Sequence, residues 1–337
     1  MKVSVIVPIY GVEKYIERCA RSLFEQTLNS IEYLFVDDCS PDASIEILEQ
    51  VLEEYPHRKS QVRIIRHETN KGAAIARKNG ILAATGEYLI HCDSDDWVDR
   101  DMYRAMYAKA IEEGVDVVLC SSWYNATETN YSVTHCNTDY NHILQKGTMY
   151  YLWLRLVRRQ LFIDNLIIFP IDHMMEDIVF TIQTTYYSSN YALIDAPYYY
   201  YYRNQDSICV NQSEEYCKKR WQQAKNNIDI VIGFMQRLRI EKQYTDQLTE
   251  LKMAPRSFLY PLLKKDMKYY SDWYNTYPEL NKQFLFAKGL SLSNKVFFAI
   301  TLLKLYPLVT KLKKYYIKTY SNATNFICII IAYVLIF

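Results

Sequence analysis

The stretch LIHCDSDDW, residues 89–97, joins an apolar run to three aspartates within four positions. The apolar run is typical of a buried strand, and the acidic residues follow where that strand would end. Asp93, Asp95 and Asp96 repel one another unless a positive group lies between them. A hard divalent cation meets this need, since Mg²⁺ or Mn²⁺ combines one or two carboxylates with substrate phosphates. A helix cap needs only one carboxylate, so capping alone is a poor explanation of this loop.

Short apolar strands alternate with amphipathic helices around this stretch. We predict strands at residues 3–8, 31–36, 62–65, 88–92 and 115–120. We predict helices at residues 13–26, 43–55, 73–84 and 102–112. This alternation indicates βαβ units, hence an α/β fold with a mixed, mostly parallel sheet flanked by helices.

Two acidic loops are expected at one edge of that sheet. Asp37 and Asp38 follow the second predicted strand, and the DSDD segment follows the fourth. Ligands of such sheets bind outside the carboxyl ends of the strands. The alternative is structural, because Asp37 or Asp42 could cap the helix that starts near residue 43.

Several functional classes fit the sequence poorly. No G-x-G-x-x-G follows the first strand and no G-x-x-x-x-G-K-[ST] is present, which disfavours dinucleotide oxidoreductases and P-loop enzymes. The net charge of +1 and the lack of a basic, aromatic-rich patch give no reason to expect nucleic acid as a partner. The eight cysteines form no C-x-x-C pair, so we expect free thiols.

Four ordered segments resemble the family 2 inverting glycosyltransferases of the GT-A fold. They are VSVIVPIYGVEKYIERCARSLFEQTL, FVDDCSPDAS, NKGAAIARKNGI and GEYLIHCDSDDWVDRDMY, which span roughly residues 1–115. The resemblance resumes in LRLVRRQLFIDNLIIFP, MEDIVF and YYYYYRNQDSI. It implies a Rossmann-like GT-A domain that binds a nucleotide-sugar.

The resemblance also implies roles for residues at the first sheet edge. Pro8 and Tyr10 would line the nucleotide pocket. Asp38, with Asp37 beside it, would accept a hydrogen bond from the ring N–H of uracil or a similar base.

The segment IARKN departs from the family pattern. Arg77 would approach the base or the phosphates, as the resemblance implies. Lys78 stands where the family usually has Asn, and Asn79 follows one place later. This departure concerns the local contacts of the segment and not the fold.

The DSDD loop corresponds to the family's D-x-D motif. By the resemblance, Asp95 is the direct ligand of Mn²⁺ or Mg²⁺, and Asp93 completes the pair and contacts the ribose. Asp96 would hold water or sugar hydroxyls, and Arg203 would pair with the diphosphate. Trp97 is expected to pack, as are most tyrosines of residues 198–202, although their rings could also stack on sugars.

Glu176 and Asp177 supply a candidate general base. An acceptor hydroxyl that attacks the anomeric carbon must lose its proton, and a carboxylate can take it. Two adjacent acids also shift each other's pKa. By analogy with the family, Asp177 is the base and Glu176 orients it or binds the acceptor. The alternative is a helix start, where acidic residues are favoured by the helix dipole.

The C-terminal part of the chain has a different composition. We expect a catalytic domain at residues 1–210 and a helical extension at residues 211–337, with an apolar run at 296–309. A lysine-rich stretch, KLKKYYIKTY, precedes the apolar FICIIIAYVLIF. A span needs about 20 apolar residues, so this run favours an interfacial anchor on anionic lipid. The alternative is a hydrophobic helix docked on the domain.

Together these features predict an inverting glycosyltransferase that transfers a sugar from a UDP-sugar to a glycan or lipid-linked acceptor in cell-surface polysaccharide synthesis. The enzyme would be cytoplasmic and peripheral to the inner face of the membrane. Two rivals remain. A nucleotidyltransferase would need a Gly-rich loop with Lys or Arg after the first strand, which PIYGVEKY lacks. A non-catalytic sugar-nucleotide-binding relative would not need both DSDD and MED.

Overall fold

A computed structural model describes residues 1–124, 132–135, 150–203, 213–284 and 292–305. The chain divides into two compact units, Met1–Val210 and Asn211–Phe337. Each is described by itself below.

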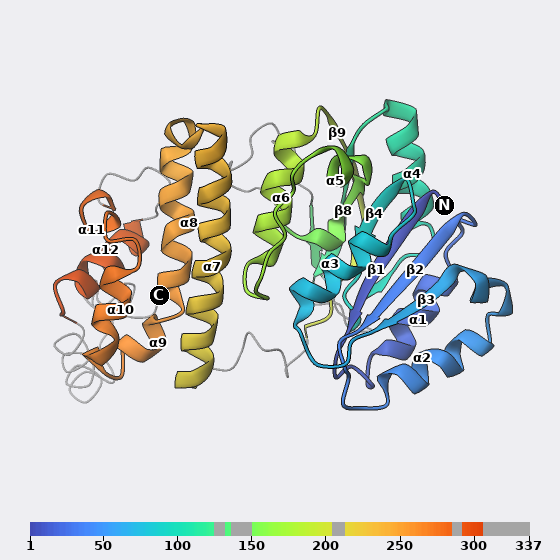
Figure 1. The fold of residues 1–337 in the computed structure, drawn as a ribbon, viewed down its shortest axis with the longest axis horizontal. Helices are drawn as coiled ribbons and strands as arrows, with labels where there is room; N and C mark the ends of the chain where they lie inside the picture. Colours follow the sequence, from blue (N-terminus) through green and yellow to red (C-terminus); the bar gives the residue numbers. More distant parts are fainter. Residues whose placement is uncertain (125–131, 136–149, 204–212, 285–291, 306–337) are drawn as a thin grey trace, which may run out of the picture. The chain divides into compact units, whose positions relative to one another are not determined.

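One mixed sheet flanked by helices forms the first unit (Figure 1). Its strands are β1 Val3–Ile9, β2 Ile31–Asp37, β3 Val62–Arg66, β4 Tyr88–His91, β5 Trp97–Val98, β6 Val117–Tyr124, β7 Ser132–Thr134, β8 Arg155–Arg158 and β9 Tyr191–Tyr200. They lie in the order β3-β2-β1-β4-β8-β6-β9-β5, and β7 pairs with β6. The strands from β3 to β4 in this order are parallel, whereas β8 is antiparallel to both of its neighbours.

Helices cover both faces of this sheet. They are α1 Ile16–Phe24, α2 Ser44–Glu53, α3 Ala73–Ala83, α4 Met102–Glu113, α5 Gln160–Asp164 and α6 Glu176–Tyr187. Alternate residues of β1 divide between two cores: Val5 packs with α1, α2 and α4, and Ile6 packs with Ile81 and Phe180 of α3 and α6. A Cβ at Gly80 would lie 2.4 Å from the Ile6 side chain, so glycine lets α3 approach β1 closely.

The predicted α/β alternation is confirmed, with small shifts at the element ends. The helix expected from residue 13 begins only at Ile16. The preceding residues form a turn instead, in which the Tyr15 N–H donates to the Val12 carbonyl at 2.8 Å. The Glu13 N–H donates to the Asp42 carboxylate at 2.9 Å, which ties this turn to the start of α2. Asp42 also accepts from the Ser44 N–H at 3.2 Å, but the N-cap residue of α2 is Ala43, so Asp42 is not the cap that the structural alternative proposed.

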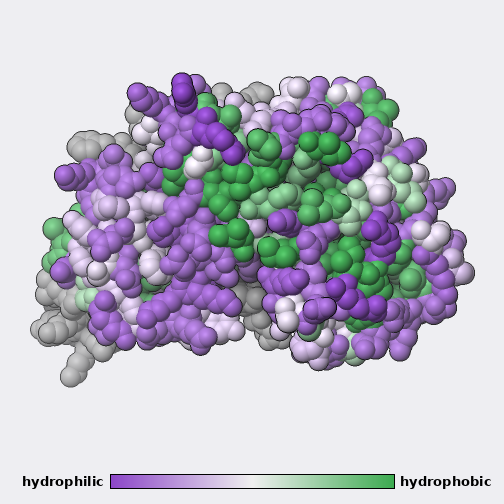
Figure 2. Space-filling model, in the orientation of Figure 1, coloured by the Kyte–Doolittle hydropathy of each residue, from purple (hydrophilic) through white to green (hydrophobic). Residues whose placement is uncertain are grey.

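Exposed apolar side chains occur on the first unit. Figure 2 shows apolar residues over the part of the drawn face where α3, α5 and α6 lie in Figure 1. Leu82 of α3, Ile163 of α5 and Leu166 after it are more than half exposed. The described cysteines, Cys19, Cys39, Cys92, Cys120 and Cys217, are free thiols, as predicted.

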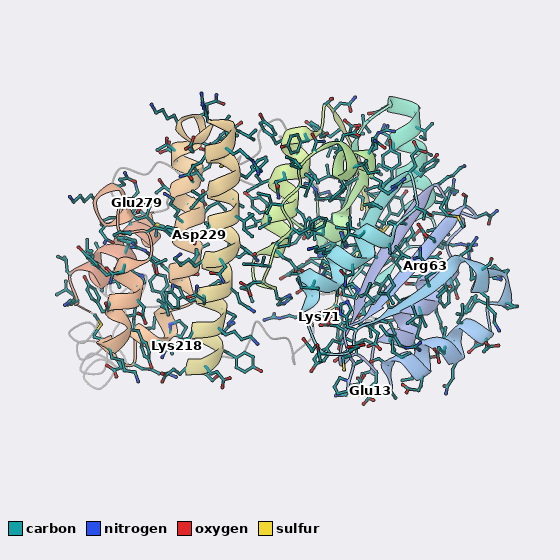
Figure 3. All side chains as sticks on the ribbon, viewed as in Figure 1. Glu13, Arg63, Lys71, Lys218, Asp229 and Glu279 are labelled. Carbon is teal, nitrogen blue, oxygen red and sulfur yellow. The ribbon has the colours of Figure 1, made fainter. Side chains whose placement is uncertain are left out.

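The second unit is helical, as expected for the C-terminal extension. Its helices are α7 Glu214–Leu238, α8 Thr245–Ser257, α9 Tyr260–Leu263, α10 Tyr270–Asn275, α11 Leu280–Gln283 and α12 Leu292–Leu302. Helix α7 packs along α8. Asp229 of α7, labelled in Figure 3, accepts from the Tyr277 hydroxyl at 2.8 Å. The buried Arg256 of α8 donates to the carbonyls of Thr276 and Tyr277, which satisfies a guanidinium removed from water.

The predicted membrane anchor cannot be placed in this fold. The lysine-rich stretch and the apolar residues 326–337 lie outside the described residues, as does the end of the 296–309 run. Among the helices that the structure does describe, none is both long and apolar enough to cross a bilayer.

Candidate active site

Parallel pairing brings the predicted site residues of the first unit to one edge of the sheet. Strand β1 pairs with β2 so that Ile9 lies opposite Asp37, and with β4 so that Ile6 lies opposite His91. Pro8 therefore lies at the same edge as the two acidic loops, and Tyr10 follows it with about half of its surface exposed. The prediction that the loops after β2 and β4 share one edge of the sheet is confirmed.

Arg77 of α3 connects the DSDD loop to the acidic pair of α6. Its Nη2 donates to Oδ1 of Asp93 at 2.6 Å, and its Nε donates to Oε1 of Glu176 at 2.7 Å. Burial alone would lower the pKa of Arg77, but the two carboxylates outweigh it and raise that pKa. Arg77 is thus a fixed positive charge between two acidic segments. Its positive charge offsets part of the repulsion among the aspartates of the DSDD loop.

Glu176 is the acid that this arrangement keeps charged. The side chain is buried, and burial would raise its pKa, but the charges of Arg77 and His173 lower it. His173 contributes from 3.7 Å, between its Nδ1 and Oε2 of Glu176. The same carboxylate raises the pKa of His173. Glu176 is therefore held as an ion in a fixed position at the start of α6.

Asp177 has the opposite electrostatic character. Burial, together with the negative charge of Glu176, raises its pKa to about 6. One oxygen, Oδ1, accepts from the Ile178 N–H at 2.9 Å. A carboxylate whose pKa lies near neutrality can both take and release a proton under working conditions. The role of Asp177 as base stays a prediction, and its environment suits that role better than the environment of Glu176.

The DSDD loop is fixed from strand β9. The Tyr199 hydroxyl accepts from the Asp93 N–H at 3.0 Å and donates to Oδ2 of Asp96 at 2.7 Å. The second oxygen of Asp96 accepts from the Tyr202 N–H at 2.7 Å. Burial raises the pKa of Asp96, and the charges of Asp95 and Asp93 add to this effect.

These contacts give Asp96 a structural role in the loop. The side chain is 0% exposed, so it presents no surface to a sugar in this structure. Asp96 fixes the loop through Tyr199 and Tyr202, and the expectation that it holds water or sugar hydroxyls stays a prediction. The sequence motif gave no indication of this, because burial depends on a strand a hundred residues later.

Asp95 lies on the same loop and is partly exposed. Arg18 of α1 donates from Nη2 to the Asp95 backbone carbonyl at 3.0 Å. The Arg18 guanidinium lies 3.8 Å from the centre of the Trp97 ring and 4.8 Å from that of Tyr202. Trp97 packs, as predicted, and Arg18 is a second positive charge beside this loop. Sequence reasoning did not identify Arg18.

Asp38 holds the turn that precedes α3. It is 3% exposed and accepts from Nδ1 of His67 at 2.7 Å, from the Lys71 N–H at 2.8 Å and from the Gly72 N–H at 2.7 Å. Lys71, labelled in Figure 3, lies just before the start of α3. A nucleotide base that bonded to Asp38 would share the carboxylate with three protein donors. Asp37 is also buried and accepts from the Ser40 N–H at 2.9 Å.

Asn79, at the place where this segment departs from the family pattern, contacts His67. Its side-chain nitrogen lies 2.8 Å from Nε2 of His67, so the offset Asn completes a chain from Asp38 through His67 to α3. His67 was missed by sequence reasoning, since a lone histidine in a polar segment carries no pattern of its own. Arg203 is exposed after the end of β9, and its contact with a diphosphate stays a prediction.

A family model described as glycosyl transferase family 2 matches residues 4–175. The chain belongs to this family. The predicted GT-A type is also confirmed by the fold, since a structure of Staphylococcus aureus TarS 1-349 in complex with UDP-GlcNAc has a TM-score of 0.69, with 22% identity, over 91% of this chain and 89% of that one.

Curated relatives of this family 2 chain are also glycosyltransferases by name. The chain is 33% identical over 220 residues to the uncharacterized glycosyltransferase EpsJ of Bacillus subtilis, covering 61% of this chain and 62% of EpsJ. It is 30% identical over 207 residues to the poly(ribitol-phosphate) β-N-acetylglucosaminyltransferase TarS of S. aureus, covering 60% of this chain and 35% of TarS. The matched part is thus less than two thirds of either relative.

Proposed function

We propose that the first unit transfers a sugar from a UDP-sugar to a hydroxyl of a glycan or lipid-linked acceptor, with inversion at the anomeric carbon, in cell-surface polysaccharide synthesis. The observation that carries the proposal is the Arg77 bridge. It joins the loop expected to face the donor diphosphate to the acidic pair expected to face the acceptor. The names of the relatives support sugar transfer, and the TarS complex supports a UDP-linked donor.

The donor would lie along the edge formed by β1, β2 and β4. Pro8, Tyr10, Asp37 and Asp38 would surround the base. Asp93 would contact the ribose from the third loop, and Arg203 would meet the diphosphate from the end of β9. Arg77 is already paired with Asp93 and Glu176, so we assign it chiefly to holding these two carboxylates in place.

The residues of the DSDD loop fit a cation that is shared with the substrate. In the described part of the chain, no three His, Cys, Asp or Glu side chains form a metal cluster. This does not suit a resident ion held by protein alone, but Mn²⁺ or Mg²⁺ on phosphates needs only one or two carboxylates. Asp95 would hold it, with Asp93 beside it. When bound, such an ion supplies Lewis-acid stabilisation of the charge on the departing diphosphate.

Asp177 would act as the general base. Its carboxylate takes the proton of the acceptor hydroxyl while that oxygen forms a bond to the anomeric carbon. The bond from that carbon to the nucleoside diphosphate breaks on the opposite face, so the configuration inverts in one displacement. Glu176, kept ionised by Arg77, raises the pKa of Asp177 and so increases its proton affinity.

The proposed setting is the cytoplasmic face of the membrane. A lipid-linked acceptor would be reached there, and the lysine-rich stretch and apolar residues 326–337 have the composition of an interfacial anchor.

Calorimetry of UDP with and without Mn²⁺, combined with hydrolysis assays on a panel of UDP-sugars, tests the proposal. We expect UDP binding that strengthens with Mn²⁺, and slow release of sugar from one donor. Donor binding without hydrolysis or transfer would indicate a non-catalytic relative. Release of pyrophosphate from a nucleoside triphosphate would indicate a nucleotidyltransferase.

A further inference from the structure

Four aromatic rings form a stacked row in the first unit. Tyr124 stacks on Tyr201 with centroids 5.1 Å apart and planes 4° apart. Tyr201 lies 5.8 Å from Trp153, and Trp153 lies 4.8 Å from Tyr151, both with planes about 20° apart. Trp153 is 6% exposed, whereas Tyr124 is 39% and Tyr151 is 42% exposed. The row therefore has a buried middle and two open ends.

The buried part of this row is fixed to the DSDD loop. Trp153 also stacks on Tyr199, with centroids 4.3 Å apart. Tyr199 is the residue whose hydroxyl holds the Asp93 N–H and the Asp96 carboxylate. The orientation of the Tyr151 ring is thus set by a rigid chain of aromatic contacts that ends at the proposed donor site.

The segment that carries Tyr151 is held against α6, the helix that also carries Asp177. The Thr181 hydroxyl donates to the Tyr150 carbonyl at 3.0 Å, which holds this segment against α6. Thr181 is four residues after Asp177, so the two side chains lie on the same face of that helix. Burial raises the pKa of the Tyr151 phenol, and interaction with Asp177 adds to this effect.

We propose that Tyr151 is a platform on which a pyranose ring of the acceptor stacks. A half-exposed aromatic ring on a rigid support offers a flat apolar face, and the C–H face of a pyranose is complementary to it. An acceptor sugar on this platform would present a hydroxyl to Asp177. This inference rests on the proposed function and adds the acceptor class: a cyclic sugar rather than an open-chain polyol.

Saturation-transfer NMR on the full chain tests the platform with two probes, methyl β-D-glucopyranoside and ribitol. We expect the pyranoside signal to be strongest on ring C–H protons and its affinity to exceed that of ribitol. Tyr151→Phe should keep this binding, whereas Tyr151→Leu and Tyr151→Ala should weaken it about 3- to 10-fold, the range for loss of one aromatic stacking contact. Tyr216→Ala, on α7 with similar exposure, is the matched control and should have no effect.

Two results would overturn the platform: equal pyranoside affinity in the wild type and Tyr151→Ala, or equal loss in Tyr151→Phe and Tyr151→Ala. Mn²⁺-dependent UDP binding is measured on the same samples and should be the same in all of them. If the wild type shows no Mn²⁺-dependent UDP binding, the proposed function is rejected. If it shows that binding but does not prefer the pyranoside to ribitol, only the platform is rejected. Circular dichroism melting of Tyr151→Leu shows whether a loss reflects unfolding.

Discussion

Arg77 and Glu176 are 99 positions apart in the chain, and Nε of Arg77 lies 2.7 Å from Oε1 of Glu176. The same guanidinium bonds to Asp93, so α3 holds the loop after β4 and the start of α6 in one arrangement. The proposed donor and acceptor sides of the site are therefore joined by one buried guanidinium, that of Arg77.

Arg77→Met should strongly destabilise the protein. It leaves the buried Glu176 carboxylate with only His173 nearby, and loss of one member of a buried pair typically costs about 3–5 kcal/mol in the free energy of unfolding. Asp93 is partly exposed, so the lower end of that range is expected. Urea denaturation of the two proteins measures the difference.

Arg21→Met provides the matched control for this prediction. Arg21 also bridges two acids, Glu17 and Glu54, but both of these carboxylates are more than half exposed to water. Exposed pairs contribute little, so its unfolding midpoint should shift far less. Similar shifts for both variants would show that Arg77 is not a buried bridge.

Asp177→Asn should reduce turnover while leaving UDP affinity nearly unchanged. General-base removal typically costs about 10²–10⁴-fold in rate, and a loss confined to turnover indicates an interaction made only in the transition state. Glu176→Gln should lose less turnover, because it keeps the shape but weakens the bond to Arg77. Steady-state transfer by both variants is the measurement. A dead Glu176→Gln beside an active Asp177→Asn would reverse the two roles.

The pH dependence of stability should identify Asp177 independently of activity. Its pKa is about 6 in the folded protein, against about 3.9 for an ordinary aspartate, so the folded state binds this proton more tightly. The group therefore favours folding most at low pH, and that contribution is lost as the pH rises to about 6. Asp177→Asn should gain stability relative to the wild type between about pH 4 and 7. A constant difference in urea midpoint across this range would contradict the raised pKa.

Asp95→Ala should abolish the Mn²⁺-dependent part of UDP binding, and transfer with it. The reason is the loss of the carboxylate proposed to hold the cation on the diphosphate. Asp99→Ala removes a nearby carboxylate, which accepts from the Asp101 N–H, and should leave metal-dependent binding in place. Calorimetry with and without Mn²⁺ compares the two. Unchanged metal dependence in Asp95→Ala would place the cation elsewhere.

Deletion of residues 325–337 should move the protein from the membrane fraction to the supernatant. The deleted run is apolar, and its burial in lipid would provide most of the attachment, with the lysines adding attraction to anionic headgroups. Fractionation of cell extracts is the measurement, with UDP binding as the control for an intact first unit. A shortened chain that still sediments with membranes would place the anchor in another segment, such as residues 296–309.

The parallel half of the sheet was predictable because its strands and helices repeat a local pattern of apolar residues. The meeting of Asp37 and Asp93 at one edge followed from topology. The pairing of Arg77 with Glu176 could not be predicted, because no local pattern links residues in different parts of the chain. The burial of Asp96 could not be predicted for a related reason: it depends on Tyr199 and Tyr202, which come from strand β9 and the segment after it.

The hydrogen bonds of Tyr199 also determine the order in which the chain can complete its site. The family match ends at residue 175, and strand β9 begins at Tyr191. A nascent chain that has emerged only as far as the family boundary can pair β1, β2 and β4, but it leaves Asp96 without either of its donors. A carboxylate in that state resists burial. The DSDD loop should therefore be among the last parts of this unit to become ordered during synthesis, although its sequence is among the first to be made.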